Sequence, residues 1–415
     1  MQIRTLDVLR CPFCGGRLEL VTSLYFRRQG DEIQDGILGC QCCIFPVVSG
    51  IPVLHLQAQA TTARDQIQAA RPDLARRTMF GLEDEGLANR FETAARSESA
   101  TYRELVDALG PHFEGRYFLY RFSDPTYVVA EAVVRATAGT VLKGGGRAVD
   151  ICGGSGHLTR SLVEFSSPAP ILADLYFAKV WLARRFTAPG CEPVCCDGNA
   201  PLPFARGAFR FAMCSDAFQY IWTKRQFVGE MARLIDGEGE QGAVLISHTH
   251  NERQWSPSHG QPLSPDGYRN LFETLEPRMF GEAGLLADVV NGGPLDLSRR
   301  DGPDTLDRDP ALTIVATRRA DVFCPHPLET RSVARGEFRV NPLYAVEAED
   351  DSLRLRLTFP SEDYEQEYGA CRQYLPDTLV LARRVVRDLN AEPLPPGCID
   401  LARRRVILDL PRNYC

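Results

Sequence analysis

The sequence has no apolar run of about 18 residues, which excludes a membrane-spanning helix as its organising element. It also lacks a low-complexity tract and an amino-terminal export signal. Lysine is scarce, because 47 residues are basic and only Lys143, Lys179 and Lys224 among them are lysines. We attribute this excess of arginine to a GC-rich coding genome rather than to phosphate binding. These absences predict a soluble, cytoplasmic protein with no membrane partner.

The composition is that of an ordinary globular chain of 415 residues, with 44% hydrophobic and 24% charged residues. The length leaves room for roughly two to four domains. The net charge of -7 argues against a large RNA or DNA substrate, although it does not exclude a local basic face. Fourteen cysteines suit a reducing cytosol, where a free thiol packs as a small apolar group.

Two C-x-x-C pairs near the amino terminus predict a metal site. Cys11-Pro-Phe-Cys14 and Cys40-Gln-Cys-Cys43 each present two thiolates from a tight turn, and a segment this short lacks the core to fold unaided. We predict one structural zinc ion held by Cys11, Cys14, Cys40 and Cys43, with Cys42 as a packing residue. The alternative, a pair of disulfides, would require an oxidising compartment. Four closed ligands leave the ion no catalytic position.

The run Phe45 to Leu54 after the second pair makes residues 1–57 similar to the zinc-ribbon family that includes the activator subunit of transfer-RNA methyltransferases. In that family the ribbon docks on or precedes a methyltransferase domain. A related ribbon precedes the catalytic domain of ribosomal-RNA guanine methyltransferases, where it helps to grip RNA.

The segment Val149 to His157, with the sequence VDICGGSGH, is the most informative motif of the chain. A short apolar strand runs into an acidic residue and then into glycines that open a helix. Glycines at such a turn let the backbone approach a ligand and tolerate a positive φ, and the amide ends of the following helix face that ligand. The pattern is typical of an α/β sheet that binds a nucleoside-bearing cofactor.

Three further strands end in polar residues. Ile171 to Asp174 lies at the βαβ distance from Asp150 at which a carboxylate meets ribose hydroxyls. The strand Glu192 to Cys196 ends in Asp197, and Phe209 to Cys214 ends in Ser215 and Asp216. Each strand therefore stops where binding residues are expected.

This order resembles class I S-adenosylmethionine-dependent methyltransferases over roughly residues 145 to 318, which implies a Rossmann-like α/β fold with a seven-stranded sheet. By the resemblance, the first acid and the glycines hold the methionine and ribose part of the cofactor. The acid after the second strand holds the ribose, and the acid after the third touches the adenine amine. The implied cofactor-binding residues are Asp150, Cys152, Gly153, Gly154, Gly156, Asp174, Leu175, Asp197, Gly198 and Ser215.

The chain departs from the family at Cys152, which stands where the family usually has the first glycine of Gly-x-Gly-x-Gly. We expect a packing role for this thiol, because no base is identified beside it. A nicotinamide cofactor is disfavoured, because its diphosphate needs the longer G-x-G-x-x-G spacing.

Residues for the reaction are expected beyond the carboxyl ends of the fourth strand and of a fifth, Ala243 to Ser247. His248, His250 and Asn251 follow the fifth strand, and we predict that His250 is the base that deprotonates the acceptor. Two alternatives remain, namely a merely structural histidine and a metal site made with His259 and Asp216. Ser215, Asp216, Gln219 and Tyr220 are expected to line the acceptor pocket.

The remaining chain is assigned by pattern. Residues 58–140 are predicted to be a helical linker and lid, with Gln57 to Arg77 as a linker or exposed helix and Ser123-Asp-Pro125 as the cap of a later helix. Residues 141–320 form the methyltransferase domain, closed by a hairpin of strands Leu285 to Val290 and Leu312 to Thr317. Residues 321–415 are expected to form a small β or α+β domain that packs over the active site or makes a homodimer contact.

The leading prediction is a methyltransferase that acts on oxygen or nitrogen of a small or medium-sized acceptor, in specialised metabolism or saccharide modification. Two alternatives remain: an RNA methyltransferase that grips nucleic acid through the ribbon, and a non-catalytic binding protein of the same fold.

Overall fold

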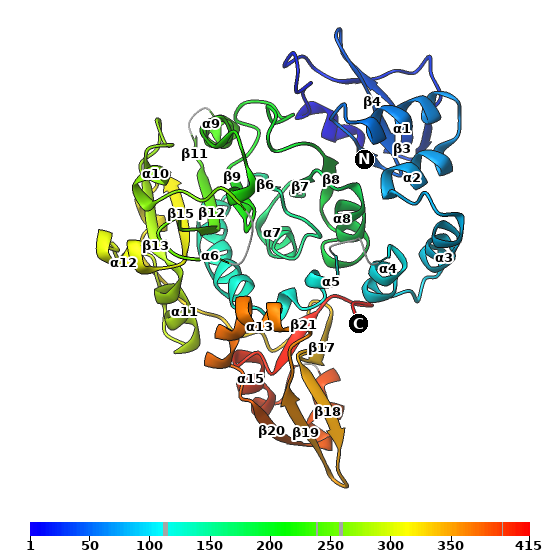
Figure 1. The fold of residues 1–415 in the computed structure, drawn as a ribbon. Helices are drawn as coiled ribbons and strands as arrows, with labels where there is room; N and C mark the ends of the chain where they lie inside the picture. The colour runs from blue at the N-terminus through cyan, green and yellow to red at the C-terminus, as the bar shows by residue number, and fades with distance from the viewer. Residues whose placement is uncertain (111–114, 238–239, 257–259, 392) are drawn as a thin grey trace.

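The computed structural model describes residues 1–415 except 111–114, 238–239, 257–259 and 392 (Figure 1). Its centre is a seven-stranded sheet in the order β13-β15-β12-β9-β6-β7-β8, in which β15 runs antiparallel to both of its neighbours. The strands are β6 (Ala148–Ile151), β7 (Ile171–Asp174), β8 (Glu192–Cys195), β9 (Phe211–Ser215), β12 (Ala243–His250), β13 (Pro277–Gly281) and β15 (Ala311–Thr317). The order reverses direction at β6, so the ends of β6 and β9 flank the crevice where such sheets bind ligands.

The closing hairpin contains the one strand that was assigned to the wrong residues. Leu285 to Val290 is not a strand but part of helix α11 (Glu282–Val290), and the strand beside β15 is β13. Short apolar runs do not distinguish a buried strand from a helix by periodicity alone. Leu285 and Leu286 are buried on the helix, while Val289 is only partly buried.

Helices cover both faces of the sheet. The apolar side of α6 (Pro125–Val141) packs with α7 (Thr159–Phe165) and α11 against one face, and α9 (Lys224–Leu234) packs against the other. Helix α8 (Phe177–Leu182) continues into a π-helical turn, Ala183–Thr187. The predicted cap of α6 is confirmed, since the Asp124 side chain accepts a hydrogen bond from the Tyr127 amide and Pro125 occupies the first turn.

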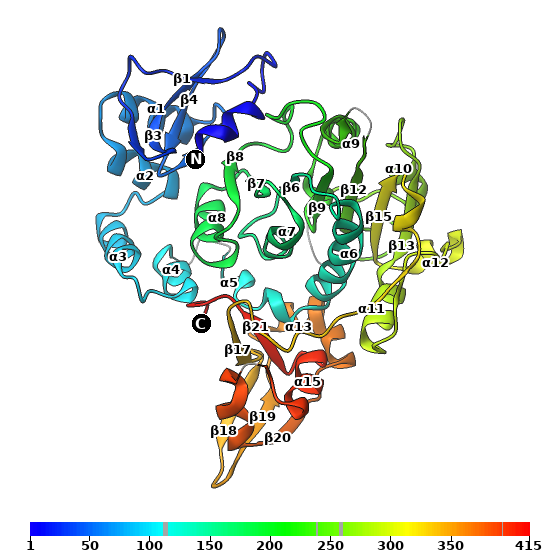
Figure 2. The same cartoon turned by 180° about the vertical axis from the view of Figure 1, so that it is seen from behind.

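The amino-terminal ribbon is a small sheet after the turn Ile3–Asp7. Its strands are β1 (Glu19–Leu20), β2 (Arg27–Gln29), β3 (Glu32–Gly39), β4 (Ile44–Val48) and β5 (Ile51–Pro52). Both cartoon views place it beside β8 and α8 (Figures 1 and 2). Val53 forms a parallel bridge with Cys195, and the Leu54 amide donates to the Cys195 carbonyl at 2.7 Å, so the ribbon extends the edge of the central sheet.

The segment after the ribbon, predicted to be a linker or an exposed helix, is helical but is not exposed along its whole surface. It forms α1 (Ala58–Gln68) and α2 (Pro72–Phe80), whose residues Ala60, Ala63 and Ile67 are buried with Val48 and Ile51 of the ribbon. Small side chains allow close packing of a helix on a sheet. The helices α3 (Glu85–Arg96), α4 (Tyr102–Ala108) and α5 (Gly115–Phe118) then lead to α6.

The carboxyl-terminal region is α+β, as expected (Figure 1). It pairs β17 with β21 and places β18, β19 and β20 in a second small sheet. Its strands and helices are β17 (Glu337–Val340), β18 (Tyr344–Ala348), β19 (Ser352–Leu357), β20 (Thr378–Ala382), β21 (Ile407–Leu410), α13 (Glu362–Tyr368), α14 (Arg383–Arg387) and α15 (Pro396–Arg403).

The smaller elements are short connections. The strands are β10 (Asp236–Gly237) with β11 (Glu240–Gln241), and β14 (Leu295–Asp296) with β16 (Pro325–His326); the helices are α10 (Pro265–Arg269) and α12 (Pro303–Arg308). Among the described residues, no helix combines the length and the apolar character needed to cross a bilayer.

Candidate active site

The glycine loop between β6 and α7 adopts the backbone that its sequence predicts. Cys152, Gly154 and Gly156 all have positive φ, at 59°, 54° and 75°. A Cβ on Gly153 would lie 2.6 Å from Cγ of Asp150 and 2.3 Å from Leu172, so only glycine fits there. The turn therefore requires glycine at position 153 and a left-handed backbone on either side of it.

Asp150 supports this loop from inside the protein. It is buried, and its Oδ2 accepts a hydrogen bond of 2.6 Å from the Thr159 hydroxyl. Burial, reinforced by the Asp174 charge, raises the pKa of Asp150 to about 7. Its Oδ1 is buried and accepts no hydrogen bond from the described residues, which is uncommon for a carboxylate oxygen.

Asp174 ties two loops together at the end of β7. Its carboxylate accepts hydrogen bonds of 2.9 Å from the amides of Gly154 and Tyr176. Burial raises the pKa of Asp174, and Lys179 and these amides partly offset that effect. Phe118 of α5 covers the same place, since a Cβ on Gly154 would meet its ring at 3.4 Å.

The loop after β8 lies against the glycine loop. Asp197 is half-buried and accepts a hydrogen bond of 2.8 Å from the Asn199 amide. A Cβ on Gly198 would be 3.1 Å from Sγ of Cys152, which shows how closely the two loops approach. The Leu175 carbonyl faces the Cys195 thiol at 3.1 Å. Because β6, β7 and β8 are parallel neighbours, the three predicted acids end at one edge of the sheet.

The ends of β9 and β12 bring Asp216, His248 and His250 together. One ligand atom from each lies within 4.8 Å of the others. Asp216 and His248 have positive φ, at 53° and 49°, in a conformation that non-glycine residues adopt rarely. Ser215 joins the same two strands, because its Oγ accepts a hydrogen bond of 2.8 Å from Ser247.

Glu282, at the start of α11, fixes His248. Its carboxylate accepts hydrogen bonds from the His248 amide at 2.8 Å and from Nδ1 at 2.7 Å. Burial opposes a charge on His248, but Glu282 and then Asp216 outweigh it and raise its pKa to about 9. His248 is therefore an imidazolium at neutral pH.

His250 has the opposite character. Its Nδ1 lies 3.0 Å from the Ser256 hydroxyl, and its ring meets the His248 ring edge to face at 5.4 Å. Burial and the charge of His248 lower the pKa of His250 to about 4. Two adjacent histidines are thus held in different protonation states at pH 7, one as a cation and one as a neutral base.

Arg121 and Tyr117 form a roof over Asp216. Nη1 of Arg121 lies 2.9 Å from Oδ2 of Asp216, and the Tyr117 hydroxyl donates to the same oxygen at 3.0 Å. Although burial disfavours its charge, Arg121 and His248 hold the pKa of Asp216 below its usual range. Tyr368 of α13 reaches the Tyr117 hydroxyl at 2.9 Å, so the carboxyl-terminal region also contributes to this roof.

Sequence reasoning missed Tyr117, Arg121, Glu282 and Tyr368. Tyr117 and Arg121 belong to no recognised motif, although their i, i+4 spacing is a helical signal. Glu282 directly follows β13, a strand that the sequence pattern did not indicate. Tyr368 follows Tyr117 by 251 residues in the sequence, so no local pattern connects them.

The structure gives Asn251 and its neighbours other contacts. The side-chain amide of Asn251 donates hydrogen bonds of 2.9 Å to the carbonyls of Leu306 and Asp309, so this residue holds the segment before β15 in place. Gln219 is buried and donates to Asp216 at 3.3 Å, whereas Tyr220 is exposed. His259, the third histidine considered for a metal site, lies outside the described residues.

The amino-terminal thiols converge, but with one exchange. The Sγ atoms of Cys11, Cys14, Cys40 and Cys42 all lie within 4.8 Å of one another. The Sγ–Sγ distances are 3.6 Å for Cys11 and Cys42, 3.7 Å for Cys14 and Cys40, and 3.5 Å for Cys40 and Cys42. Four thiolates around one tetrahedral zinc ion would be about 3.8 Å apart. Cys42 stands in this group in place of the predicted Cys43. All fourteen cysteines are free thiols.

The turn geometry explains the exchange. Cys43 packs against the buried cluster beneath the ribbon, and its carbonyl accepts a hydrogen bond of 3.0 Å from the Cys40 amide, which closes the turn. Cys42 lies at the exposed tip, with its amide 3.4 Å from Sγ of Cys40. Spacing between cysteines favours Cys43, but the side chain that this turn directs toward Cys40 is that of Cys42.

Comparison with known proteins gives no family assignment. No protein-family model matches the sequence, and no curated protein matches it. Solved structures similar to this chain include a putative methyltransferase of Bacillus halodurans, with 16% identity, 47% of this chain and 99% of that chain covered, and a TM-score of 0.30. A second is a complex of the Haloferax volcanii Trm112 methyltransferase activator with a putative methyltransferase. Its identity is 19%, the match covers 46% of this chain and 90% of that chain, and the TM-score is 0.33. A third is geranyl diphosphate C-methyltransferase of Streptomyces coelicolor, with 16% identity, 44% of this chain and 76% of that chain covered, and a TM-score of 0.32.

Proposed function

We propose that the protein is an S-adenosylmethionine-dependent methyltransferase that acts on an oxygen or nitrogen of a small or medium-sized acceptor. The observation that carries this proposal is the meeting of two sets of residues at one sheet edge. The glycine loop and the acids after β7 and β8 lie on one side of β6. The cluster of Asp216, His248 and His250 follows β9 and β12 on the other side. A methyl donor and a proton acceptor would therefore be neighbours.

The loop residues fit such a cofactor. By the resemblance stated above, Gly154, Gly156 and Asp150 would hold the methionine and ribose part, Asp174 the ribose and Asp197 the adenine amine. The positive φ angles of the loop expose backbone rather than side chains, and Oδ1 of Asp150 is a buried acceptor with no partner among the described residues. When bound, S-adenosylmethionine supplies a methyl group that a nucleophile can take in a single displacement.

The polar cluster would orient the acceptor and take its proton. His250 is neutral at pH 7, so it can accept a proton from a hydroxyl or amine as the new bond forms. His248 is held as a cation by Glu282 and cannot act as a base. Tyr117 and Tyr368 above Asp216, together with Phe118 over the glycine loop, would limit the access of water to the reacting groups.

We also propose that the four converging thiols of the ribbon hold a structural zinc ion. The ribbon and helices α1 and α2 share one buried cluster with α8, so metal binding would stabilise a support for the Asp174 side of the sheet. We assign the ion no part in the reaction, because four thiolates close its coordination.

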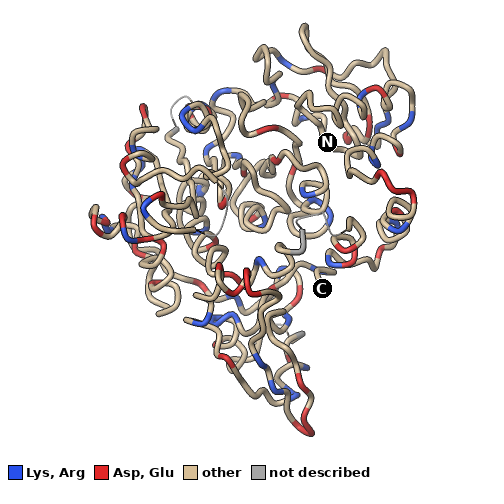
Figure 3. The backbone as a smooth tube through the Cα atoms, in the orientation of Figure 1, with Lys and Arg blue, Asp and Glu red and all other residues tan. Residues whose placement is uncertain are grey.

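An RNA substrate has less support. The ribbon, residues 1–57, carries five arginines and five acidic residues and is therefore neutral. Figure 3 shows basic and acidic residues interspersed along the ribbon and the central elements. Gripping RNA through the ribbon would require an excess of positive charge there.

Calorimetric titration of the full chain with S-adenosylmethionine tests the cofactor proposal. We expect saturable binding that Asp197→Ala weakens about tenfold or more, because the proposed contact with the adenine amine is lost. The substitution should leave the fold intact, because this carboxylate is half-buried and has few contacts within the protein. Asp174→Asn should weaken binding at least as much. Asp236→Asn is the control, since Asp236 is exposed in a surface pair with Arg206. No heat at millimolar ligand in the unaltered protein would refute the proposal.

Turnover distinguishes the enzyme from a binding protein of the same fold. Tritium-labelled S-adenosylmethionine incubated with a panel of small alcohols, phenols, amines and saccharides should yield a labelled product. Binding of the cofactor with no transfer to any small acceptor, together with labelling of RNA that weakens steeply as salt rises, would instead establish the RNA alternative.

A further inference from the structure

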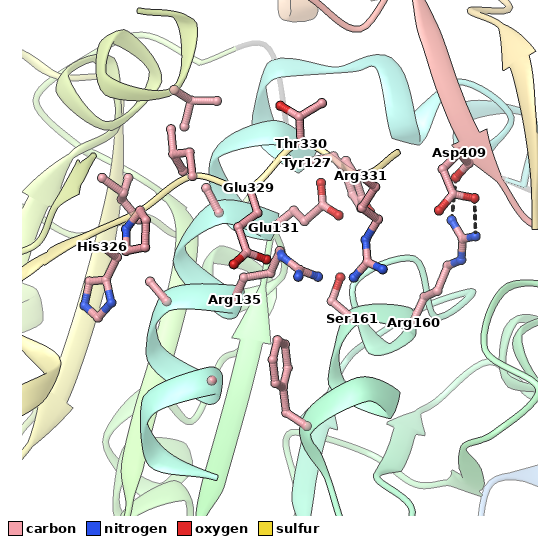
Figure 4. A pocket seen from close by; sticks show the side chains of 18 of the residues that line it. Tyr127, Glu131, Arg135, Arg160, Ser161, His326, Glu329, Thr330, Arg331 and Asp409 are labelled. Carbon is pink, nitrogen blue, oxygen red and sulfur yellow. Dashed lines mark hydrogen bonds and ion pairs between the residues drawn. The ribbon is translucent and has the colours of Figure 1, made fainter. Parts of the chain in front are cut away.

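A cavity of about 1080 Å³ lies away from the residues assigned to methyl transfer. Its walls come from α6, α7, the segment 326–335 that enters the carboxyl-terminal region, and residues 402–409 (Figure 4). The cavity is therefore completed only when the carboxyl-terminal region packs on the sheet domain. Nothing in the proposed reaction uses it.

The walls of this cavity are strongly basic. Arginine and lysine outnumber aspartate and glutamate nine to four among the lining residues. Three of these carboxylates each form an ion pair with a lining arginine: Glu131 with Arg405 at 2.8 Å, Asp409 with Arg160 at 2.9 Å and Asp321 with Arg319 at 2.5 Å. Glu329 is exposed, and its carboxylate points toward the Arg135 guanidinium (Figure 4). These carboxylates leave a substantial positive excess.

That excess concentrates around Glu164. Arg135 contacts its carboxylate at 2.8 Å, and Arg331 and Arg335 contact the same carboxylate. The side chains of all three arginines are less than one third exposed, at 23%, 30% and 21%. These three guanidinium groups thus form ion pairs with one shared carboxylate, while Glu131 and Glu329 also act electrostatically on Arg135. Burial, and then the charge of Arg331, lower the pKa of Arg135, as expected for crowded cations.

An uncompensated group of half-buried cations is costly unless an anion joins it. Nε of Arg335 is buried and donates to no acceptor among the described residues. Guanidinium groups that converge in this way match the oxygens of a phosphoryl group, which can accept bidentate hydrogen bonds and carries about two negative charges.

The rest of the wall is apolar. The Phe165 ring lies under the Arg135 guanidinium at 5.5 Å, and Leu328, Phe338 and Ile407 also line the cavity. An inorganic ion alone would leave this surface and most of the volume unfilled. The cavity is suited to a molecule with an anionic group at one end and an apolar body.

We propose that this cavity binds an organic phosphate, with its phosphoryl group between Arg135, Arg331 and Arg335 and its apolar part against Phe165 and Leu328. The ligand class goes beyond the methyl-transfer proposal and does not depend on it. Because residues from the sheet domain and from the carboxyl-terminal region both take part, the bound ligand fastens these two parts of the chain together.

Calorimetric titration with phenyl phosphate at constant ionic strength tests the proposal. We expect saturable binding below about 1 mM, weaker binding of inorganic phosphate, and weaker binding of benzoate, which has one charge fewer. Arg331→Gln should weaken phenyl phosphate about tenfold or more, since one charge-assisted contact is lost. Glu164→Gln should tighten it, because removal of the competing carboxylate leaves three cations for the ligand. Arg354→Gln, in an exposed pair with Glu349 of the carboxyl-terminal region, is the control.

Thermal melting of each variant establishes that it is folded before titration. The proposal fails if phenyl phosphate does not saturate by about 10 mM, if Arg331→Gln binds as the unaltered chain does, or if Glu164→Gln binds more weakly. It also fails if a single-stranded oligonucleotide displaces phenyl phosphate at far lower concentration, because the cations would then serve a nucleic-acid backbone. Asp197→Ala should bind phenyl phosphate normally, so failure of the cofactor proposal leaves this result unaffected.

Discussion

Cys152, Asp216 and His248 have positive φ although none of them is glycine. Cys152 directly follows β6, Asp216 directly follows β9 and His248 lies near the end of β12, and these three strands are adjacent in the sheet. Such backbone costs on the order of 1–3 kcal/mol at each residue, and the surrounding structure must impose it. The departure from glycine at Cys152 is therefore one of three similar features. Backbone strain at the carboxyl edge accompanies the residues that we assign to binding and proton transfer.

The role of His250 is tested by His250→Ala. We expect cofactor affinity to be nearly unchanged and methyl transfer to slow by a factor of about 100 or more, because the neutral imidazole is the proposed base. The measurement is single-turnover transfer to an acceptor found by the radiolabel screen, compared with cofactor calorimetry on the same sample. Partial recovery of the rate with added imidazole is expected, while an unaltered rate would disprove the role.

The ion pair of His248 and Glu282 predicts a dependence of stability on pH. The folded pKa of His248, about 9, lies above its ordinary value of 6.5. The pair therefore stabilises the fold fully below about pH 6.5, and this contribution, on the order of 3 kcal/mol, is lost as pH rises through 9. The charged or titratable groups that act on His248 or lie beside it are Glu282, Asp216, His250, Arg121, Asp124 and Glu367.

The corresponding experiment compares urea unfolding of the unaltered chain and of Glu282→Gln between pH 6 and 9.5, with these limits chosen as roughly the window between the two pKa values. The variant should be less stable at the lower limit, because a buried cation loses its partner. The difference in unfolding free energy between the two proteins should shrink as pH rises. A difference that stays constant with pH would show that His248 is neutral in the folded protein.

At the scale of elements, strand and helix signals differed in reliability. The parallel strands β6, β7, β8 and β9 end at or near the polar residues that the sequence indicated, because parallel strands buried on both faces have a continuous apolar sequence. The outer strand β13 was missed, since Pro277–Gly281 has few apolar residues and the following helix α11 has many. Edge strands are specified more by their neighbours than by their own residues.

The turn Cys40–Cys43 yields a prediction about the zinc ligands. We expect Cys42→Ser to lower the zinc content, measured by metal analysis of protein purified without chelator, to well below half an equivalent, because the closed site then has three thiolates. Cys43→Ser is the matched control and should retain about one equivalent. The reverse result would return the fourth ligand to Cys43, and absence of zinc from the unaltered protein would refute the site.

At the scale of the whole molecule, the end of the chain contacts its centre. Tyr414 is fully buried, its hydroxyl lies 2.8 Å from Nε2 of His157, and it donates to the Phe118 carbonyl at 2.5 Å. Its ring stacks on Tyr102 at 4.8 Å. The last residues thus join helix α4, the segment Phe118 that covers the glycine loop, and the loop residue His157.

We therefore expect Tyr414→Phe to lower the melting temperature measurably, since it leaves buried polar atoms of His157 and Phe118 without the hydroxyl, at a cost of about 1–3 kcal/mol. Tyr414→Ala should have a larger effect, because it also removes the ring from the core. Tyr25→Phe, at a half-exposed position of the ribbon, is the control and should change stability by less than about 0.5 kcal/mol. Equal melting temperatures for Tyr414→Phe and the unaltered chain would contradict this role.

The sequence by itself determined the features that depend on local chemistry. Apolar runs ending in Asp150, Asp174, Asp197 and Ser215 defined four parallel strands of the sheet, and the cysteine pairs defined the ribbon. Each of these signals lies within a few residues, where backbone conformation and side-chain spacing decide the outcome.

Only the tertiary structure decided which distant residues meet. Glu282 raises the pKa of His248, and Arg121 and Tyr117 contact the Asp216 carboxylate. Three arginines from two regions of the chain contact the Glu164 carboxylate. These contacts set the charge of each group, because pKa values depend on burial and on neighbours that are far away in the sequence. Packing of the carboxyl-terminal region on the sheet domain adds Tyr368 to the contacts of Tyr117 and completes the basic cavity.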